Sequence, residues 1–206
     1  MTWEKNMKKL ALVCAVMVAQ FVSAQEKVPL EEAQKGARLL NESAGTIAEP
    51  QVKVDLDFDK PMAFKTDKVG FLTVPDKKFT TETLSKVGTN VMPVGQLWMM
   101  IAAPAKDGAV IPNHKLRLIT VRQKDKEAQL QMYFLGARKA EKEGLELVLY
   151  GKDKEPLLQL PLTKAEGAQD TPIEIGGRKD DDSSGTLTLN LLGKYHAEFK
   201  VMKQED

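Results

Sequence analysis

Cysteine and histidine are scarce in this chain of 206 residues, which has one cysteine, Cys14, and two histidines, His114 and His196. Cys14 lies in a leader-like N-terminal segment, so a chain beginning at Gln25 has no cysteine and gains no stability from disulfides. A tetrahedral zinc site would then depend on carboxylates, because two histidines alone cannot complete it. These scarcities exclude a disulfide scaffold and disfavour a zinc centre.

Motifs for nucleophilic or phosphate chemistry are also missing. The chain has no Gly-x-Ser-x-Gly sequence and no glycine-rich phosphate loop. Asp55, Asp57 and Asp59 alternate along one predicted strand and could mimic a carboxylate site, but a general acid needs an apolar setting. We interpret them as a solvated face. The sequence therefore favours a non-catalytic protein, and the alternative is a hydrolase whose carboxylates come together only in the fold.

A large excess of charge of one sign is lacking too. The formal net charge is +1, with acidic and basic residues finely mixed along the chain. Nucleic-acid binding needs basic residues gathered into a stripe, so we expect no nucleic-acid partner. Beyond the N-terminal segment, no apolar run is long enough to cross a bilayer as a helix. We therefore expect a protein that does not span a membrane.

The N-terminal segment resembles a secretory signal peptide over residues 1–24. Lys8 and Lys9 precede an apolar run over residues 10–22, and a small-x-small sequence ends at Ala24. This run is too short and wrongly flanked for a stable membrane span. Met7 begins a complete leader by itself, which makes it a second candidate start. The sequence predicts export, with a periplasmic or extracellular protein after cleavage.

Residues 25–49 form an N-terminal segment with one predicted helix. Over residues 30–44, acidic Glu31 and Glu32 fall in the first turn, which suits the helix dipole, and Gly45 is a plausible stop. The apolar stripe of this helix is thin. We therefore expect the helix to dock on a larger body.

Alternating apolar and polar residues replace the helical pattern after Pro50. This period of two predicts half-buried strands with one wet face. Pro161 indicates that its strand lies at an edge, and Gly193-Lys194 predicts a two-residue hairpin turn. With no intervening helices, residues 50–206 are expected to form an antiparallel β-sandwich or barrel. The predicted strands cover residues 52–58, 127–134, 145–149, 158–162, 187–191 and 195–201.

The stretch 95–104 differs because both of its faces are apolar. We expect a central strand covered on both sides, since doubly apolar strands are usually buried. In the alternative interpretation, Trp98 and Met100 form an apolar surface that meets a ligand or partner.

A sugar-binding surface is predicted from the pairing of residues 127–134 with residues 145–151. If each strand keeps one apolar face inward, odd positions on the first strand meet even positions on the second. Tyr133 and Gln131 then share the outer face with Tyr150. Two tyrosines with a neighbouring amide could stack on sugar rings and hydrogen-bond hydroxyls, whereas the structural alternative is cross-strand aromatic support.

The acidic loop over residues 180–185 has part of the spacing of a calcium-binding turn. Asp180, Asp182 and Ser184 place oxygen ligands at the first, third and fifth positions, and Gly185 occupies the sixth. The bidentate Glu of such a loop is missing, and exposed hairpin loops prefer the same residue types. Calcium is therefore the one cofactor to test, and we otherwise expect none.

Together these patterns predict an exported, non-catalytic β-sandwich of the cell envelope or extracellular space. It would act by binding an envelope protein or a polysaccharide. The alternative is a small β-barrel carrier in which Trp98 and Met100 line a pocket for a lipid or other hydrophobic ligand.

Overall fold

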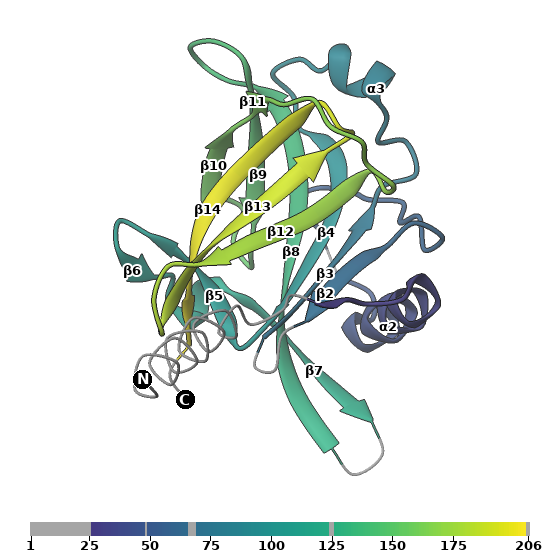
Figure 1. Cartoon of the computed structure of the whole chain (residues 1–206), viewed down its shortest axis with the longest axis vertical. Coiled ribbons are helices and arrows are strands. Elements are labelled where there is room, and N and C mark those ends of the chain that lie inside the picture. Colours follow the sequence, from purple (N-terminus) through teal and green to yellow (C-terminus); the bar gives the residue numbers. More distant parts are fainter. Residues whose placement is uncertain (1–25, 48, 66–68, 124–125, 205–206) are drawn as a thin grey trace, which may run out of the picture.

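Alternating apolar residues give the chain two antiparallel β-sheets, packed face to face with one long helix near the N-terminus and one short helix outside them (Figure 1). The computed structural model describes residues 26–47, 49–65, 69–123 and 126–204, so the predicted signal peptide lies outside the described residues. The elements in chain order are β1 (Glu26–Lys27), α2 (Leu30–Ala44), β2 (Met62–Lys65), β3 (Gly70–Pro75), α3 (Thr81–Ser85), β4 (Met92–Met100), β5 (Ala102–Lys106), β6 (Ala109–Val110), η2 (Asn113–Lys115), β7 (Arg117–Gln123), β8 (Lys126–Lys139), β9 (Leu145–Tyr150), β10 (Leu158–Pro161), β11 (Thr163–Lys164), β12 (Ile173–Lys179), β13 (Ser184–Leu191) and β14 (Tyr195–Lys203).

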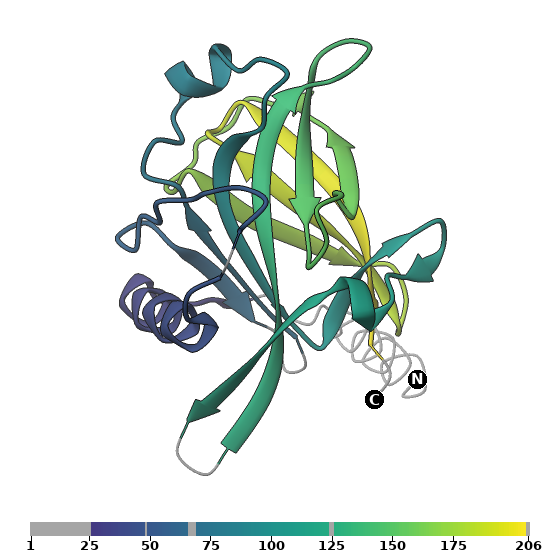
Figure 2. The same cartoon turned by 180° about the vertical axis from the view of Figure 1, so that it is seen from behind.

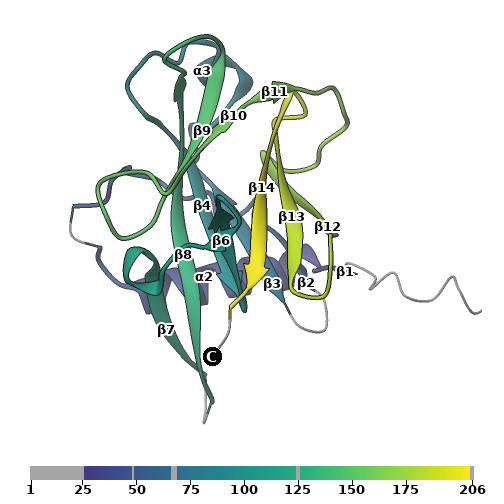
Figure 3. The ribbon, with the colours of Figure 1, turned by 90° about the vertical axis from the view of Figure 1, so that its left-hand side faces the viewer.

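The predicted antiparallel sandwich is confirmed. The larger, 8-stranded sheet has the order β1-β2-β3-β4-β8-β9-β10, with β7 paired to β8. The smaller, 6-stranded sheet has the order β12-β13-β14-β5-β6, with β11 paired to β14. Figure 3 shows the two sheets as layers side by side.

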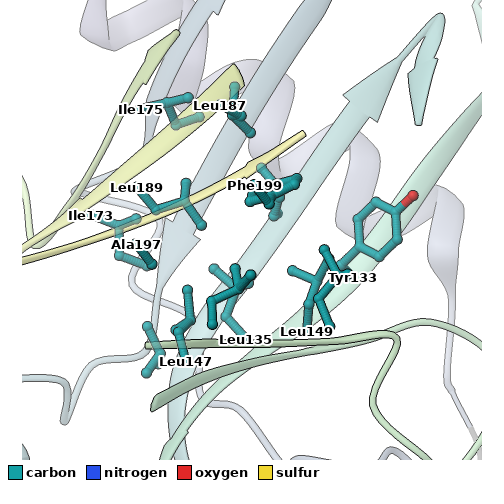
Figure 4. Close-up of a cluster of buried hydrophobic side chains, with 14 of the residues drawn as sticks. Tyr133, Leu135, Leu147, Leu149, Ile173, Ile175, Leu187, Leu189, Ala197 and Phe199 are labelled. Carbon is teal, nitrogen blue, oxygen red and sulfur yellow. The ribbon is translucent and has the colours of Figure 1, made fainter. Parts of the chain in front are cut away.

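The main core fills the space between the two sheets. Tyr133, Leu135 and Leu149 on the larger sheet face Leu189 and Phe199 on the smaller one (Figure 4). All five are buried, as expected for the inner faces of a sandwich. Burial of this apolar surface is the main force that holds the two layers together.

A second apolar cluster covers the outer face of the larger sheet. Helix α2 buries Ala33, Ala37 and Leu40 against it, and the buried Leu72 and Trp98 belong to the same cluster. Figures 1 and 2 show the helix beside β2 and β3, outside the sandwich. The predicted helix over residues 30–44 is confirmed with the same bounds, and it docks on the larger body as its thin stripe indicates.

Strand β4 is central and covered on both faces. Leu97 and Met99 belong to the core between the sheets, whereas Trp98 belongs to the cluster under α2. The prediction of one strand over residues 95–104 is wrong at Ile101, where φ is 69°. There the chain leaves the larger sheet and continues as β5 in the smaller one, which is how strands form the corners of packed sheets.

The predicted strand over residues 52–58 is wrong, although its alternating burial is real. Val52 and Leu56 are buried, but this segment forms only an isolated bridge between Leu56 and Asp76. The segment runs alongside the loop that comes after β3, and the Asp55 N–H donates a hydrogen bond to the Asp76 carboxylate of that loop over 2.7 Å. Its apolar side chains belong to or pack against the cluster under α2, and its backbone does not join a β-sheet.

Two predicted details of the sheets have different outcomes. Pro161 lies in β10, the edge strand of the larger sheet, as predicted. The predicted two-residue turn at Gly193-Lys194 is wrong, because Leu191 lies opposite Tyr195 and three residues, 192–194, connect β13 and β14. Leu192 and Gly193 both have positive φ, and the Lys194 N–H donates to the Leu191 carbonyl over 3.0 Å. Positive φ at both central residues is typical of the turns that suit strand twist.

Candidate functional site

An open groove runs along the outer face of the larger sheet, between α2 and the segment 50–59. It consists of two adjoining hollows of about 400 Å³ and about 160 Å³, which share Asn41, Val54 and Leu56 as lining residues. We call it the α2 groove. Its other lining residues are Arg38, Ala44, Gly45, Ile47, Pro50, Val52, Lys53, Asp55, Asp57, Phe58, Asp59, Lys77, Gln96 and Phe134.

Each of the three aspartates in the larger hollow has a cationic neighbour. Lys77 donates to Asp55 over 2.9 Å, and this hydrogen bond is the main reason that the pKa of Lys77 is raised. Lys60 lies 3.4 Å from Asp57, and Arg38 lies 3.5 Å from Asp59. The carboxylates are thus paired at the groove wall, which agrees with a solvated charged face.

Phe58 supplies the aromatic surface of the larger hollow. The Arg38 guanidinium carbon lies 5.2 Å from the centre of the Phe58 ring, within the range of a cation–π contact. Arg38 also approaches Asp59, so the same side chain ties α2 to the segment 50–59. Gln34 strengthens this junction by donating to the Asp59 carbonyl over 3.1 Å.

Two side-chain amides in the α2 groove have free hydrogen-bonding capacity. Asn41 lines both hollows, and its amide makes no hydrogen bond to any described residue. Gln96 lines the smaller hollow and is 4% exposed. Its Oε1 accepts from Trp98 Nε1 over 3.2 Å, while its Nε2 has no partner within the described part of the chain. The groove therefore contains donors and acceptors that the protein itself does not use.

Neither amide was among the predicted site residues. Gln96 could have been found, because it is a polar residue within the otherwise apolar stretch 95–104. A buried polar side chain at such a position needs a partner or a function. Asn41 gives no comparable signal, since an asparagine on a surface helix is ordinary.

Trp98 and Met100 do not form an exposed apolar surface. Trp98 is 1% exposed and lies in the cluster under α2, and Met100 is half-buried at the end of β4. The covered-strand interpretation of this stretch is confirmed. The alternative of a Trp98 and Met100 surface is wrong because α2 and the segment 50–58 occupy that face of the sheet.

The predicted register between β8 and β9 is also wrong. Phe134 lies opposite Tyr150 and Leu135 opposite Leu149, so even positions meet even and odd meet odd. Tyr133 consequently lies on the inner face, fully buried, whereas Tyr150 lies on the outer face. The two tyrosines are on opposite sides of the sheet and cannot stack together on one sugar.

Gln131 and Tyr133 are brought together, but in a buried structural contact. The Tyr133 hydroxyl donates to Gln131 Oε1, and Gln131 Nε2 donates to Gln204 Oε1 over 2.7 Å. Burial raises the pKa of the Tyr133 hydroxyl, so the phenol stays a neutral donor. Gln204 continues the chain of hydrogen bonds to Asn113. This network holds the end of the described chain against β8.

The three predicted calcium ligands, which lie in the β12–β13 hairpin, each have a different partner. Asp180 accepts from Thr186 and from Lys200, the latter over 2.7 Å, and Asp182 pairs with Lys179. Ser184 donates its hydroxyl to Asp181 over 2.6 Å. No group of three His, Cys, Asp or Glu side chains that could hold a metal occurs among the described residues.

The Asp181 carboxylate is the acceptor that organises this loop. It accepts from the N–H and the hydroxyl of both Ser183 and Ser184, with the Ser184 hydroxyl the main cause of a pKa well below the usual aspartate value. Its folded-state pKa is depressed, so its contribution to stability is present above the unfolded pKa. That contribution is lost as the pH falls toward the folded value.

We expect Asp181→Ala to lower the melting temperature at neutral pH, because the loop loses its common acceptor. The variant should also lose less stability than the parent protein when the pH falls below about 4. Melting temperatures measured from pH 7 to acid by circular dichroism check both effects. Asp153→Ala, in another exposed loop, is the control. Parallel pH curves for Asp181→Ala and the parent protein would show that the loop hydrogen bonds do not stabilise the fold.

Comparison of the chain with protein-family models, with curated proteins and with solved structures gave no significant match. Within the described residues, no helix has both the length and the apolar character needed to cross a membrane.

Proposed function

We propose that this chain is an exported, non-catalytic β-sandwich protein that binds a polysaccharide in the α2 groove. The observation that supports this best is the pair of amides, Asn41 and Gln96, with free hydrogen-bonding capacity in one groove. The proposal keeps the expectation of polysaccharide binding from the sequence and moves its site away from Tyr133 and Tyr150.

The lining of the groove suits sugar hydroxyls. A hydroxyl both donates and accepts, and an amide offers both functions at its nitrogen and oxygen. Asn41 lies between the two hollows, where one chain of sugars could contact it from either side. The half-buried Phe58 provides apolar surface in the larger hollow for the C–H faces of sugar rings. The open shape of the groove suits an extended polymer.

The non-catalytic part of the proposal rests on the arrangement of the carboxylates. Glycoside hydrolysis needs two carboxyl groups on opposite sides of the scissile bond, one of them protonated in an apolar setting. In the α2 groove, Asp55, Asp57 and Asp59 follow one another along a single segment, and each faces a cation. This arrangement supports binding rather than acid–base chemistry.

A carrier of hydrophobic molecules has less support. The smaller hollow, beside Ala44, Ile47 and Phe134, has a volume of about 160 Å³, whereas pockets for small ligands usually measure roughly 300–1,000 Å³. Of the two residues expected to line a carrier pocket, Trp98 lies in the cluster under α2, and Met100 is half-buried at the end of β4. The carrier function is therefore considered only as one possible outcome of the binding experiment described next.

The test is binding of the chain to an array of neutral and acidic polysaccharides, followed by titration calorimetry on the best ligand. Asn41→Ala should weaken binding by roughly threefold to tenfold, the usual effect of one lost hydrogen bond. Asn190→Ala, a half-buried asparagine on the smaller sheet, is the matched control and should leave affinity unchanged.

Three results would overturn the proposal. One is the absence of binding to any polysaccharide, and another is equal weakening by Asn41→Ala and Asn190→Ala. The third is a bound mass of lipid size in native mass spectrometry of protein purified from the envelope of its own host, which would favour the carrier.

A further inference from the structure

Strand β7 forms a long free edge at one end of the larger sheet. It pairs with the first part of β8 from Arg117↔Met132 to Gln123↔Lys126, and no other strand lies beside it. Figures 1 and 2 show this pair as an arm that extends beyond the rest of the sheet. Half of the N–H and C=O groups of an edge strand point away from its partner. In β7 these outward groups have no backbone partner among the described residues.

The other sheet edges are short or covered. Strands β1, β6 and β11 have two residues each, and β10 has four residues including Pro161. Strand β12 is as long as β7, but its outer side meets the larger sheet. The Thr73 hydroxyl donates to the Ile173 carbonyl over 3.3 Å, and the Ile175 N–H donates to Met62 Sδ over 3.4 Å. The β4 side of β8 is also unpaired over residues 126–130, where the β4–β8 pairing has ended, but this open stretch has five residues against the seven of β7.

Strand β7 also lacks the usual devices that keep edges apart. It contains no proline and no lysine, and its pairing with β8 has no bulge. Its two arginines are engaged within their own chain. Arg117 donates to Gln51 and to the Gly151 carbonyl, and Arg122 donates to Glu127 over 2.8 Å. Neither guanidinium is held across the open edge.

We propose that β7 pairs antiparallel with β7 of a second copy of this chain, about a two-fold axis through Thr120. The two larger sheets then join into one continuous sheet. This inference does not rest on the proposed function, although β7 contacts α2, which forms one wall of the groove.

The sequence of β7 matches itself in this register. Thr120 meets Thr120 on the axis, and Ile119 meets Val121 of the second copy on the face that belongs to the apolar cluster. Arg122 meets Leu118, so no two like charges are directly opposite. A register shifted by one residue would place Arg117 opposite Arg122 and pair apolar with polar faces. Self-complementarity of this kind is what a two-fold interface requires, and it favours a second copy over an unrelated strand.

A cross-linking experiment tests the proposal on the chain from Gln25, which contains no other cysteine. Thr120→Cys should form an interchain disulfide on mild oxidation, since directly opposite Cα atoms in an antiparallel pair are about 4.5–5.5 Å apart, within the range that a disulfide spans. Gln129→Cys is the matched control, because Gln129 lies opposite Thr120 on β8, is also exposed, and is one strand away from the β7 edge. Across the joined sheet the two copies of residue 129 would be about 14 Å apart, too far for a disulfide.

Analytical ultracentrifugation over a range of protein concentrations gives the second readout. The parent chain should dimerise, and Thr120→Arg should weaken the dimer by at least about tenfold, because it places two positive charges on the axis. Circular dichroism checks that this exposed substitution leaves the fold intact. A monomer at all concentrations overturns the proposal. So does a dimer in which Thr120→Cys fails to cross-link, or cross-links no better than Gln129→Cys.

Discussion

Trp98→Ala is expected to lower the free energy of unfolding by about 3–5 kcal/mol, the usual range for truncation of a buried aromatic residue. Trp98 is 1% exposed and lies between Leu72 on β3 and Met132 on β8, its direct neighbours across the sheet. Its removal leaves a cavity at the junction between α2 and the larger sheet. Because a domain is stabilised by only about 5–15 kcal/mol, this loss is a large part of the total.

Urea unfolding followed by far-ultraviolet circular dichroism measures the effect. Tryptophan fluorescence is unsuitable, because the only other tryptophan, Trp3, lies in the predicted leader, and a Trp98 variant without that leader has no tryptophan. Trp98→Phe is the informative control. It keeps most of the apolar volume but removes the indole N–H that donates to Gln96 Oε1. We expect it to cost about 1–2 kcal/mol less than Trp98→Ala, and to weaken polysaccharide binding because Gln96 loses the contact that orients it.

A loss below about 1 kcal/mol for Trp98→Ala would contradict the close packing of α2 on the sheet. Such a result would mean that the cluster under the helix contributes little to stability and that the helix is docked only through its polar contacts. The most important of these are the Arg38 and Gln34 contacts to the segment 50–59.

Structural features that are determined by a short stretch of neighbouring residues could be predicted from the sequence. The helix over residues 30–44 has its acidic first turn and its Gly45 stop within one short segment, and it forms with those bounds. Pro161 lacks an N–H and is found on the edge strand β10 for that reason. The antiparallel sandwich follows from strands separated mostly by short connections. The expectation of no intervening helices is wrong at one place, because the short helix α3 lies between β3 and β4.

The register between β8 and β9 could not be predicted, because the rule used for it assumes one wet face for each strand. In the fold, the outer face of both strands is covered, with Phe134 and Tyr150 in the cluster under α2. When both faces are buried, alternation no longer tells inside from outside, and either register satisfies the pattern. A continuous apolar strand such as β4 next to β8 was the signal that the outer face is covered.

The α2 groove could not be predicted for a different reason. It combines Asn41 from the helix, the segment 50–59 and Gln96 from β4, which are brought together only by the docking of α2. The alternation of residues 52–58 predicts a strand, but an extended segment that lies on an apolar cluster has the same pattern of burial. Local periodicity reports which side chains are buried, and it does not report what covers them.

Gly95→Ala is expected to destabilise the fold by about 2–4 kcal/mol, although it adds a single methyl group. Gly95 follows a bulge in β4, where the register with β8 shifts between Pro93 and Gly95. A Cβ at this position would lie 2.3 Å from the Val74 carbonyl oxygen and 2.9 Å from the Pro75 Cα. Both atoms belong to the backbone of the neighbouring strand, so the clash can be relieved only by moving β3 away from β4.

Gly176→Ala is the matched control, since Gly176 also lies within a strand, and its Cβ would meet only the Thr188 Cβ at 3.9 Å. We expect this variant to be neutral or slightly stabilising, because alanine restricts the unfolded chain without strain in the folded one. The free energies of unfolding of both variants, measured by urea unfolding, test this difference. If the two glycines tolerate alanine equally well, β3 and β4 are not held as closely as the bulge requires. Gln96, which follows Gly95 and lines the α2 groove, would then not be held rigidly. Polysaccharide binding through its amide needs a fixed position, so this result would also count against the binding site.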